Sequence, residues 1–375
     1  RKVEDKNEVT WLNLSYARLK EIPEWVYSFK HVRVLDLSNN QISRIDKRIR
    51  DLDSLVTLNL SDNQLAGKKL RVKKNHQIKR LYLKDNELSC LPRHVRKFKG
   101  LEEIILSHNN FQGIPLYLKK NKNLTSLNIS NNCLLLDGQK LKKLAGLRQL
   151  KLSHTDMNYI PDNLWALQNL ELLQLNNNNI KSIPDKIDTL RKLVSFGIYD
   201  NQIESIPQRF YNLTNLRQID IYYNEIEIIS PEIGKLQDLE ILYLSNNKIY
   251  SLPDTLGTLK KLKELYLHNN RLSYLPATLS KIDSLHVLRV NNNYLTAFPP
   301  VILELKQLKN LDVSANDITL LPEEISKLTN LELFYFQKNP INFNNPANSH
   351  IIETVNAMEA NGTIVNPHSF EKIVR

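Results

Sequence analysis

The chain repeats itself every 23 residues, and this period constrains its fold more than any other feature. The pattern Leu-x-Leu-x-x-Asn recurs along the chain, and its last position advances by 23 residues at each step. Thr155 takes that position in one turn and Ala17 takes it in the first turn; the other turns have Asn40, Asn63, Asn86, Asn109, Asn132, Asn178, Asn201, Asn224, Asn247, Asn270, Asn293, Asn316 and Asn339. A chain of 375 residues would ordinarily suggest two or three domains. The period instead predicts one solenoid of about fifteen stacked turns.

Each part of the repeated pattern has a physical role within a turn. The alternating Leu-x-Leu stretch predicts a short strand, and strands of successive turns can pair into a parallel sheet. Where the chain leaves this sheet, backbone groups lose their partners, and a buried Asn can both donate and accept hydrogen bonds to replace them. Six residues after the Asn position, Pro begins the returning segment in most turns, at Pro23, Pro92, Pro115, Pro161, Pro184, Pro207, Pro253, Pro276, Pro299 and Pro322. We therefore interpret the Asn residues as a structural ladder.

The pattern resembles the leucine-rich repeat superfamily over residues ~9–343. The stretch from Leu242 through Asn247 and Pro253 to Leu256 is similar to the 23-residue Leu-Pro class, which is found in bacterial surface and secreted proteins and in intracellular Ras-pathway proteins. The resemblance implies an α/β fold, a leucine-rich repeat solenoid with a curved parallel sheet on its concave face. Short helical, 3-10 or extended segments are expected on the convex face.

The two ends of a solenoid need caps, because a terminal turn would otherwise expose its core. We expect the solenoid to span residues 1–345, with an N-terminal cap in the first ~30 residues that includes Trp25, Val26 and Phe29. A C-terminal helical cap and tail are expected at residues 346–375. The helix is predicted to begin at Pro346 and end near Gly362, with one buried face formed by Ile351, Ile352, Val355 and Met358.

No known catalytic or cofactor-binding motif occurs in the sequence. We therefore predict a protein that is not an enzyme and that has no cofactor, no metal site and no catalytic residue. Cys90 and Cys133 lie two turns apart, beyond comfortable disulfide distance, and are predicted to be free thiols. Asn-x-Ser motifs at Asn13, Asn59 and Asn128 fall on predicted strands, where glycans would crowd the sheet. A eukaryotic secretory route is thus disfavoured, while a bacterial surface, secretion and the cytoplasm remain open.

A cluster of aromatic and charged residues falls on the concave face in turns nine to thirteen. Its members occupy the outward positions of neighbouring strands: Tyr199, Asp220, Tyr222, Tyr223, Tyr243, Tyr266, His268 and Arg289. Tyr and Arg are enriched at protein-binding hot spots. The alternative interpretation is that these Tyr residues stack on one another and stabilise the sheet. We favour a partner-binding site.

The charge is divided unevenly along the chain. The net charge is +11, but residues 1–155 hold 31 Lys and Arg against 15 Asp and Glu, so that the remaining residues have an excess of negative charge. A secondary basic patch is predicted in returning segments at Lys68, Lys69, Arg71, Lys73, Lys74, Arg93, Arg96 and Lys97. A solvated basic face that keeps the chain soluble explains it as well as a site for polyanions does.

Three hypotheses for function follow. The first is a non-enzymatic scaffold that binds another protein through the Tyr-rich patch. The second is a binder of anionic surfaces, such as acidic polysaccharide, lipid head groups or nucleic acid, that uses the basic half; nucleic acid is disfavoured because basic and aromatic residues are rarely interleaved. The third is the substrate-recruiting part of a larger enzyme or signalling protein. We expect a monomer without a membrane span.

Overall fold

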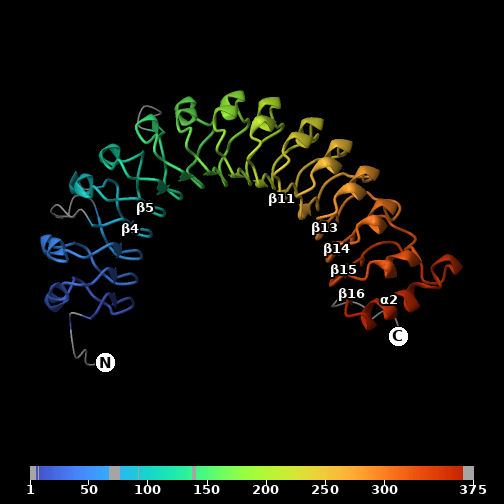
Figure 1. Cartoon of the computed structure of the whole chain (residues 1–375), viewed down its shortest axis with the longest axis horizontal. Helices are drawn as coiled ribbons and strands as arrows, with labels where there is room; N and C mark the ends of the chain where they lie inside the picture. Colours follow the sequence, from blue (N-terminus) through green and yellow to red (C-terminus); the bar gives the residue numbers. More distant parts are fainter. Residues whose placement is uncertain (1–5, 7, 67–76, 92, 137–140, 366–375) are drawn as a thin grey trace. The chain divides into compact units, whose positions relative to one another are not determined.

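The computed structural model describes residues 6, 8–66, 77–91, 93–136 and 141–365, which belong to two compact units, 1–179 and 180–375. Within each unit every turn contributes one three-residue strand, and the strands of successive turns pair in parallel at an offset of 23 residues. The strands line the inner side of each unit, and 3-10 helices lie on its outer side (Figure 1). The predicted α/β solenoid with a parallel sheet is confirmed.

The first unit contains eight described strands in chain order. They are β1 (Trp11–Asn13), β2 (Val34–Asp36), β3 (Thr57–Asn59), β4 (Arg80–Tyr82), β5 (Glu103–Ile105), β6 (Ser126–Asn128), β7 (Gln149–Lys151) and β8 (Leu172–Gln174). The described 3-10 helices of this unit are η1 (Glu24–Ser28), η2 (Lys47–Asp51), η3 (Arg93–Lys97), η4 (Leu116–Lys120) and η5 (Asp162–Ala166).

The second unit continues with the same design. Its strands are β9 (Ser195–Gly197), β10 (Gln218–Asp220), β11 (Ile241–Tyr243), β12 (Glu264–Tyr266), β13 (Val287–Arg289), β14 (Asn310–Asp312), β15 (Leu333–Tyr335) and β16 (Ile364–Val365). Its helices are η6 (Asp185–Thr189), η7 (Gln208–Asn212), η8 (Pro231–Lys235), η9 (Asp254–Thr258), η10 (Ala277–Lys281), η11 (Pro300–Glu304), η12 (Glu323–Lys327), η13 (Pro346–Asn348) and α2 (Ile351–Ala360).

The returning segment of each turn is held by hydrogen bonds between residues three apart. In the turn that contains η6, the amide of Ile187 donates to the carbonyl of Pro184, Leu190 donates to Ile187, and Leu193 donates to Leu190. All three apolar side chains are buried. A 3-10 helix has three residues per turn, so every third residue points to the same side. This spacing directs the apolar side chains toward the sheet, and very short helices complete the core.

The residue before each helix is Pro in most turns, and polar side chains take over the capping where Pro is missing. Asp46 accepts a hydrogen bond from the amide of Arg48 at 2.8 Å, and Ser230 accepts one from Glu232 at 3.3 Å. Asn345 does the same for the amide of Ala347. Pro fixes an extended backbone, whereas Asp, Ser and Asn satisfy a free amide of the first helical turn.

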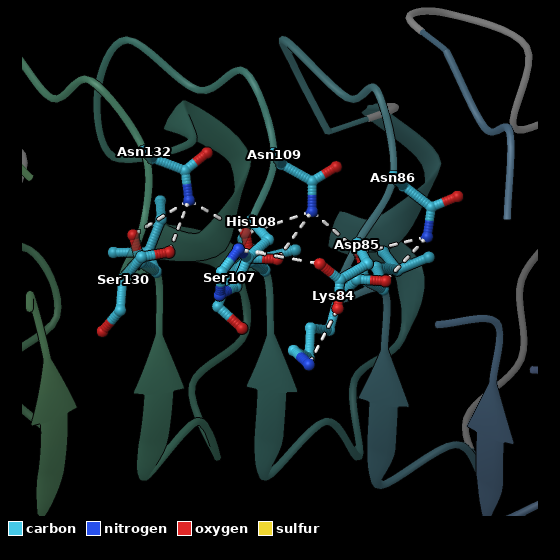
Figure 2. A network of polar contacts seen from close by, with 11 residues as sticks. Lys84, Asp85, Asn86, Ser107, His108, Asn109, Ser130 and Asn132 are labelled. Atoms are coloured by element: carbon cyan, nitrogen blue, oxygen red, sulfur yellow. Dashed lines mark hydrogen bonds and ion pairs between the residues drawn. The ribbon is translucent and has the colours of Figure 1, made fainter. Parts of the chain in front are cut away.

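The repeated Asn side chains form hydrogen bonds across adjacent turns, and Figure 2 shows three of them, Asn86, Asn109 and Asn132. Asn109 Nδ2 donates to the carbonyls of Leu83, Leu106 and Ser107 at 2.8, 3.2 and 3.1 Å. Its Oδ1 accepts from the amide of Leu88 at 2.9 Å. One amide side chain thus satisfies four backbone groups of two successive turns, which leaves few polar groups unpaired in the core.

Thr155 makes fewer of these bonds than Asn does. Its Oγ1 donates to the carbonyl of Leu152 at 2.8 Å, and its backbone amide donates to Asn178 Oδ1 at 2.9 Å. The side chain is fully buried. A hydroxyl has one proton to donate where an amide has two, so this turn has a weaker link to the turn before it.

The residue before the Asn position adopts a left-handed backbone conformation in every described turn. Its φ angle lies between 49° at Asp85 and 59° at Lys338. Asn, Asp or His occupies most of these positions, and these residues tolerate this conformation best among those with a side chain. Tyr16, Tyr223, Ala315 and Lys338 are the exceptions. This constraint cannot be recognised from the hydrophobic pattern.

Both ends differ in detail from the expectation. Val26 and Phe29 are buried at the N-terminal end, but Trp25 is 48% exposed and packs its ring edge-on against Phe29. At the other end, α2 buries Ile351, Val355 and Met358 while Ile352 is 50% exposed, so its predicted burial was wrong. Ile352 follows Ile351 directly, and adjacent helical residues point about 100° apart. The segment after the helix also forms β16, which pairs with β15.

Candidate functional site

Two rows of outward-facing residues cross four neighbouring strands of the second unit. The strand register aligns Asp220 with Tyr243, Tyr243 with Tyr266, and Tyr266 with Arg289. Because side chains two residues apart along a strand point to the same face, a second row lies beside the first. This second row includes Tyr222 from the segment after β10 and His268 from the segment after β12.

The tyrosines of these rows stack in pairs. The rings of Tyr243 and Tyr266 lie 4.6 Å apart with an interplanar angle of 19°, and those of Tyr199 and Tyr222 lie 4.4 Å apart at 10°. The Arg289 guanidinium lies over the Tyr266 ring, 5.8 Å from its centre. Such stacking holds long side chains in one geometry, and each pair contributes roughly 0.5–1.5 kcal/mol beyond the area it buries.

These side chains surround an open hollow of about 480 Å³. Seven of the eight residues expected at the site line it, and Tyr199 contributes indirectly by stacking on Tyr222. Three further residues complete the lining, namely Gln218, Ser245 and Asn246. Gln218 lies on the same strand face as Asp220, and Ser245 lies in the second row between Tyr222 and His268, so strand register alone could have identified both.

Three polar atoms in this hollow are buried and have no hydrogen-bond partner among the described residues. They are Asp220 Oδ1, His268 Nδ1 and Arg289 Nε. By contrast, the Tyr266 hydroxyl donates to Glu264 Oε2 at 2.8 Å. A polar group that is removed from water without a partner costs about 1–3 kcal/mol. Three such atoms in one hollow therefore mark a place where the free protein leaves polar groups unsatisfied.

Burial also changes the pKa values at the site. Desolvation raises the pKa of the Asp220 carboxyl to about 7. The pKa of His268 is lowered, first by burial and then by the positive charge of Arg289. Burial likewise raises the pKa of Tyr222, Tyr243 and Tyr266. The hollow thus holds an acid that changes charge near neutral pH and phenols that stay protonated there.

Tyr223 occupies one of the left-handed positions, with a φ of 52°, and its side chain is 54% exposed. The next turn has Asn246 at the equivalent position. Tyr is a costly choice for this conformation, because its Cβ crowds the backbone by about 1–2 kcal/mol. Its ring packs edge-on against Tyr222, at 5.4 Å between centres. The same conformation occurs in every described turn, so it belongs to the repeat rather than to this site alone.

Most of the predicted basic patch falls outside the described residues. Lys68, Lys69, Arg71, Lys73 and Lys74 are these residues, and the side chain of Arg93 likewise lies outside the described part. Arg96 places its guanidinium 5.9 Å from the centre of the Tyr117 ring, and Lys97 is half-buried. The polyanion hypothesis therefore remains a prediction, as does the expected monomeric state.

Cys90 and Cys133 are both free. In the residues that the structure describes, no three or more His, Cys, Asp or Glu side chains come together in a way that could hold a metal ion. Over the same residues, none of the helices combines the length and the apolar character required to span a bilayer.

Comparisons with known proteins agree with the repeat pattern. Models described as leucine-rich repeat and leucine-rich repeat region match residues 7–65, 127–225 and 207–294. No sequence among curated proteins matches the chain.

Several solved structures are similar to this chain. A leucine-rich repeat protein of Leptospira interrogans is 28% identical, with a TM-score of 0.79 and 96% of both chains covered. An internalin from Listeria monocytogenes is 22% identical, with a TM-score of 0.72 and coverage of 84% of this chain and 87% of the other. A third similar structure is the ectodomain of a plant membrane receptor kinase from Arabidopsis thaliana, solved in complex with Casparian strip integrity factor 2. It is 26% identical, with a TM-score of 0.53 and coverage of 89% of this chain and 50% of the other.

Proposed function

We propose that this chain, which belongs to the leucine-rich repeat superfamily, is a non-enzymatic scaffold that binds another protein through the Tyr-rich face of its second unit. Proteins with this fold are commonly protein-binding scaffolds. The binding surface in this proposal is the hollow between β10 and β13 together with the stacked Tyr199 and Tyr222.

The observation that supports the proposal most directly is the set of unpaired atoms of Asp220, His268 and Arg289 among stacked tyrosines. Stacking explains why tyrosines follow one another along a sheet. It does not explain why three polar atoms are buried beside them without partners. A bound protein that turns these side chains toward itself and offers them hydrogen bonds would remove their desolvation cost, and the fixed Tyr rings would lose little conformational entropy on contact.

The ring of Tyr223 supports the same proposal. It is 54% exposed and packs edge-on against Tyr222. It therefore widens the aromatic surface that a partner would contact.

The test compares protein capture by two double variants with capture by the wild type. Tyr243→Ala with Tyr266→Ala removes the central stack, whereas Tyr274→Ala with Tyr294→Ala removes two exposed tyrosines that do not line the hollow. Each variant is used as bait in a quantitative pull-down after circular dichroism has verified that it is folded. Partners captured by the wild type and by the Tyr274/Tyr294 variant should fall at least tenfold with the Tyr243/Tyr266 variant, as expected for hot-spot tyrosines. Equal capture by all three baits would refute the proposal.

A further inference from the structure

We propose that the hollow recognises an extended segment of the partner that has one basic and one acidic side chain four residues apart, with the basic side chain at Asp220 and the acidic side chain at Arg289. This inference rests on the proposed protein-binding function and specifies the chemistry of the segment that enters the hollow.

The two charges stand at opposite ends of the same row. Asp220 is on β10 and Arg289 is on β13, with Tyr243 and Tyr266 between them in register. At about 4.8 Å between neighbouring strands, three strand steps separate the two backbone positions by roughly 14 Å. The hollow therefore has a negative end and a positive end, joined by an aromatic floor.

Neither charged group forms a hydrogen bond or an ion pair within the described structure. Arg289 Nε and Asp220 Oδ1 have no hydrogen-bond partner. Asp312 follows Arg289 in the row, but its Oδ1 already accepts hydrogen bonds from the backbone amide and the hydroxyl of Ser314, at 3.0 and 2.6 Å. At the other end, the row continues with Gly197, which has no side chain to compete for Asp220. Both charged groups thus lack a direct partner among the described residues.

The spacing fits an extended chain laid along the row. An extended segment advances about 3.4 Å per residue, so residues i and i+4 lie about 14 Å apart and point to the same side. Residue i+2 then lies over the stacked rings of Tyr243 and Tyr266, where an apolar or aromatic side chain would bury the most surface. The recognised segment therefore has a basic residue, an apolar residue two positions later and an acidic residue two positions after that. A segment that runs along the row in the opposite direction has these residues in the reverse order.

The surroundings suit each end. A basic side chain at Asp220 would lie beside the Tyr222 and Tyr243 rings, whose faces attract cations. Burial raises the pKa of Asp220 because its charge has no partner, and a cation beside it would supply that partner. At the other end, the nitrogens of Arg289 and the neighbouring His268 would face a carboxylate.

A random nonapeptide library displayed inside a phage coat protein provides the test, because such peptides have no free terminus and offer only side chains. Binders are selected in parallel on the wild type, on Asp220→Asn with Arg289→Gln, and on Tyr243→Ala with Tyr266→Ala. Wild-type binders should be enriched in opposite charges four residues apart, and both variants should lose them. Wild-type binders that depend on the two tyrosines but lack the charge pair would overturn this inference and leave the proposed function standing. Absence of any binder that depends on the tyrosines would count against both.

Charge reversal separates recognition from folding. A selected peptide is synthesised with blocked ends, and a second version replaces its basic residue with Glu. The first peptide should bind Asp220→Lys at least tenfold more weakly than the wild type, and the Glu version should regain affinity for Asp220→Lys while losing it for the wild type. Because a variant that fails to fold cannot gain affinity for a new peptide, the regained binding is decisive. If both peptides bind both proteins equally, the inference is wrong.

Discussion

At the scale of single residues, Asp220 is placed where its own charge opposes folding. Burial raises the pKa of its carboxyl from 3.8 to about 7, so the folded state holds a proton that the unfolded chain releases between pH 4 and 7. Wild-type stability is therefore expected to fall as pH rises through this range. If water were excluded, the difference would be about 4 kcal/mol, and because the group is partly exposed we expect roughly half of this.

The variant Asp220→Asn cannot ionise and should escape this loss. At pH 8 it should be more stable than the wild type by about 2 kcal/mol, and at pH 4 the two proteins should unfold at nearly the same urea concentration. Tyr222 and Tyr243, which neighbour this carboxyl, stay protonated across the range and do not disturb the comparison. Urea unfolding at the two pH values measures the effect. A difference that does not change with pH would contradict the assigned ionisation.

Single residues also mark the limit of sequence reasoning. The Leu and Asn positions have a period that can be read directly, so the strands, the buried faces and the row of Asp220, Tyr243, Tyr266 and Arg289 could be predicted. The left-handed conformation of Tyr223 could not, because backbone strain leaves no hydrophobic signal. Nor could the unpaired state of Arg289 Nε, because the repeat pattern places residues in rows but does not give their side-chain conformations.

At the scale of elements, the helices on the outer side pack so closely that their spacing depends on glycine. Gly234 in η8 and Gly257 in η9 occupy equivalent positions in successive turns. A Cβ at Gly257 would lie 2.1 Å from the carbonyl oxygen of Thr278 in η10, whereas at Gly234 the nearest atoms, both on side chains, would be 3.0 Å away. Thr258 Oγ1 can rotate away and Thr255 needs to shift by only a few tenths of an ångström, whereas at Gly257 the backbone of η10 would have to move.

Gly257→Ala should therefore destabilise the protein by about 1–3 kcal/mol, while Gly234→Ala serves as the matched control and should cost less than about 1 kcal/mol. Urea unfolding measures both values. Hydrogen exchange should show loss of protection in η9 and η10 for the first variant. Equal costs for the two variants would mean that helix spacing adjusts freely, contrary to the packing described above.

The sequence predicted these outer segments only in part. The Pro positions and the apolar spacing indicated helical, 3-10 or extended returning segments that begin at Pro184 and its equivalents. The structure forms 3-10 helices directly after these residues, as at Asp185–Thr189. Asp46, Ser230 and Asn345, which cap helices where other turns have Pro, were not predicted. They begin a helix with a side-chain hydrogen bond instead of a fixed backbone angle, so a search for Pro does not find them. The strand β16 was also missed, since two residues are too few to show alternation.

At the scale of the whole molecule, a solenoid is stabilised by contacts between neighbouring turns, so its ends determine how it begins to unfold. The helix α2 closes the second unit by burying Val355 and Met358, and three side chains beyond the last turn tie the cap to the turn below. Asn348 Nδ2 donates to the carbonyl of Thr319 at 3.0 Å, Thr363 Oγ1 donates to that of Leu331 at 2.8 Å, and His350 Nε2 lies 2.7 Å from that of Leu321.

Val355→Asp tests this role, and Ile352→Asp on the same helix provides the control, because Val355 is 1% exposed and Ile352 is 50% exposed. Placing a charge at Val355 should release the cap at a cost of roughly 3 kcal/mol, while the control should change stability by less than about 0.5 kcal/mol. Hydrogen exchange should show lost protection in β15, β16 and η12, with the turns around the Tyr-rich hollow unaffected, because coupling passes only between neighbours. Loss of protection throughout the second unit would instead show that its turns unfold together, and that binding at the hollow depends on the cap.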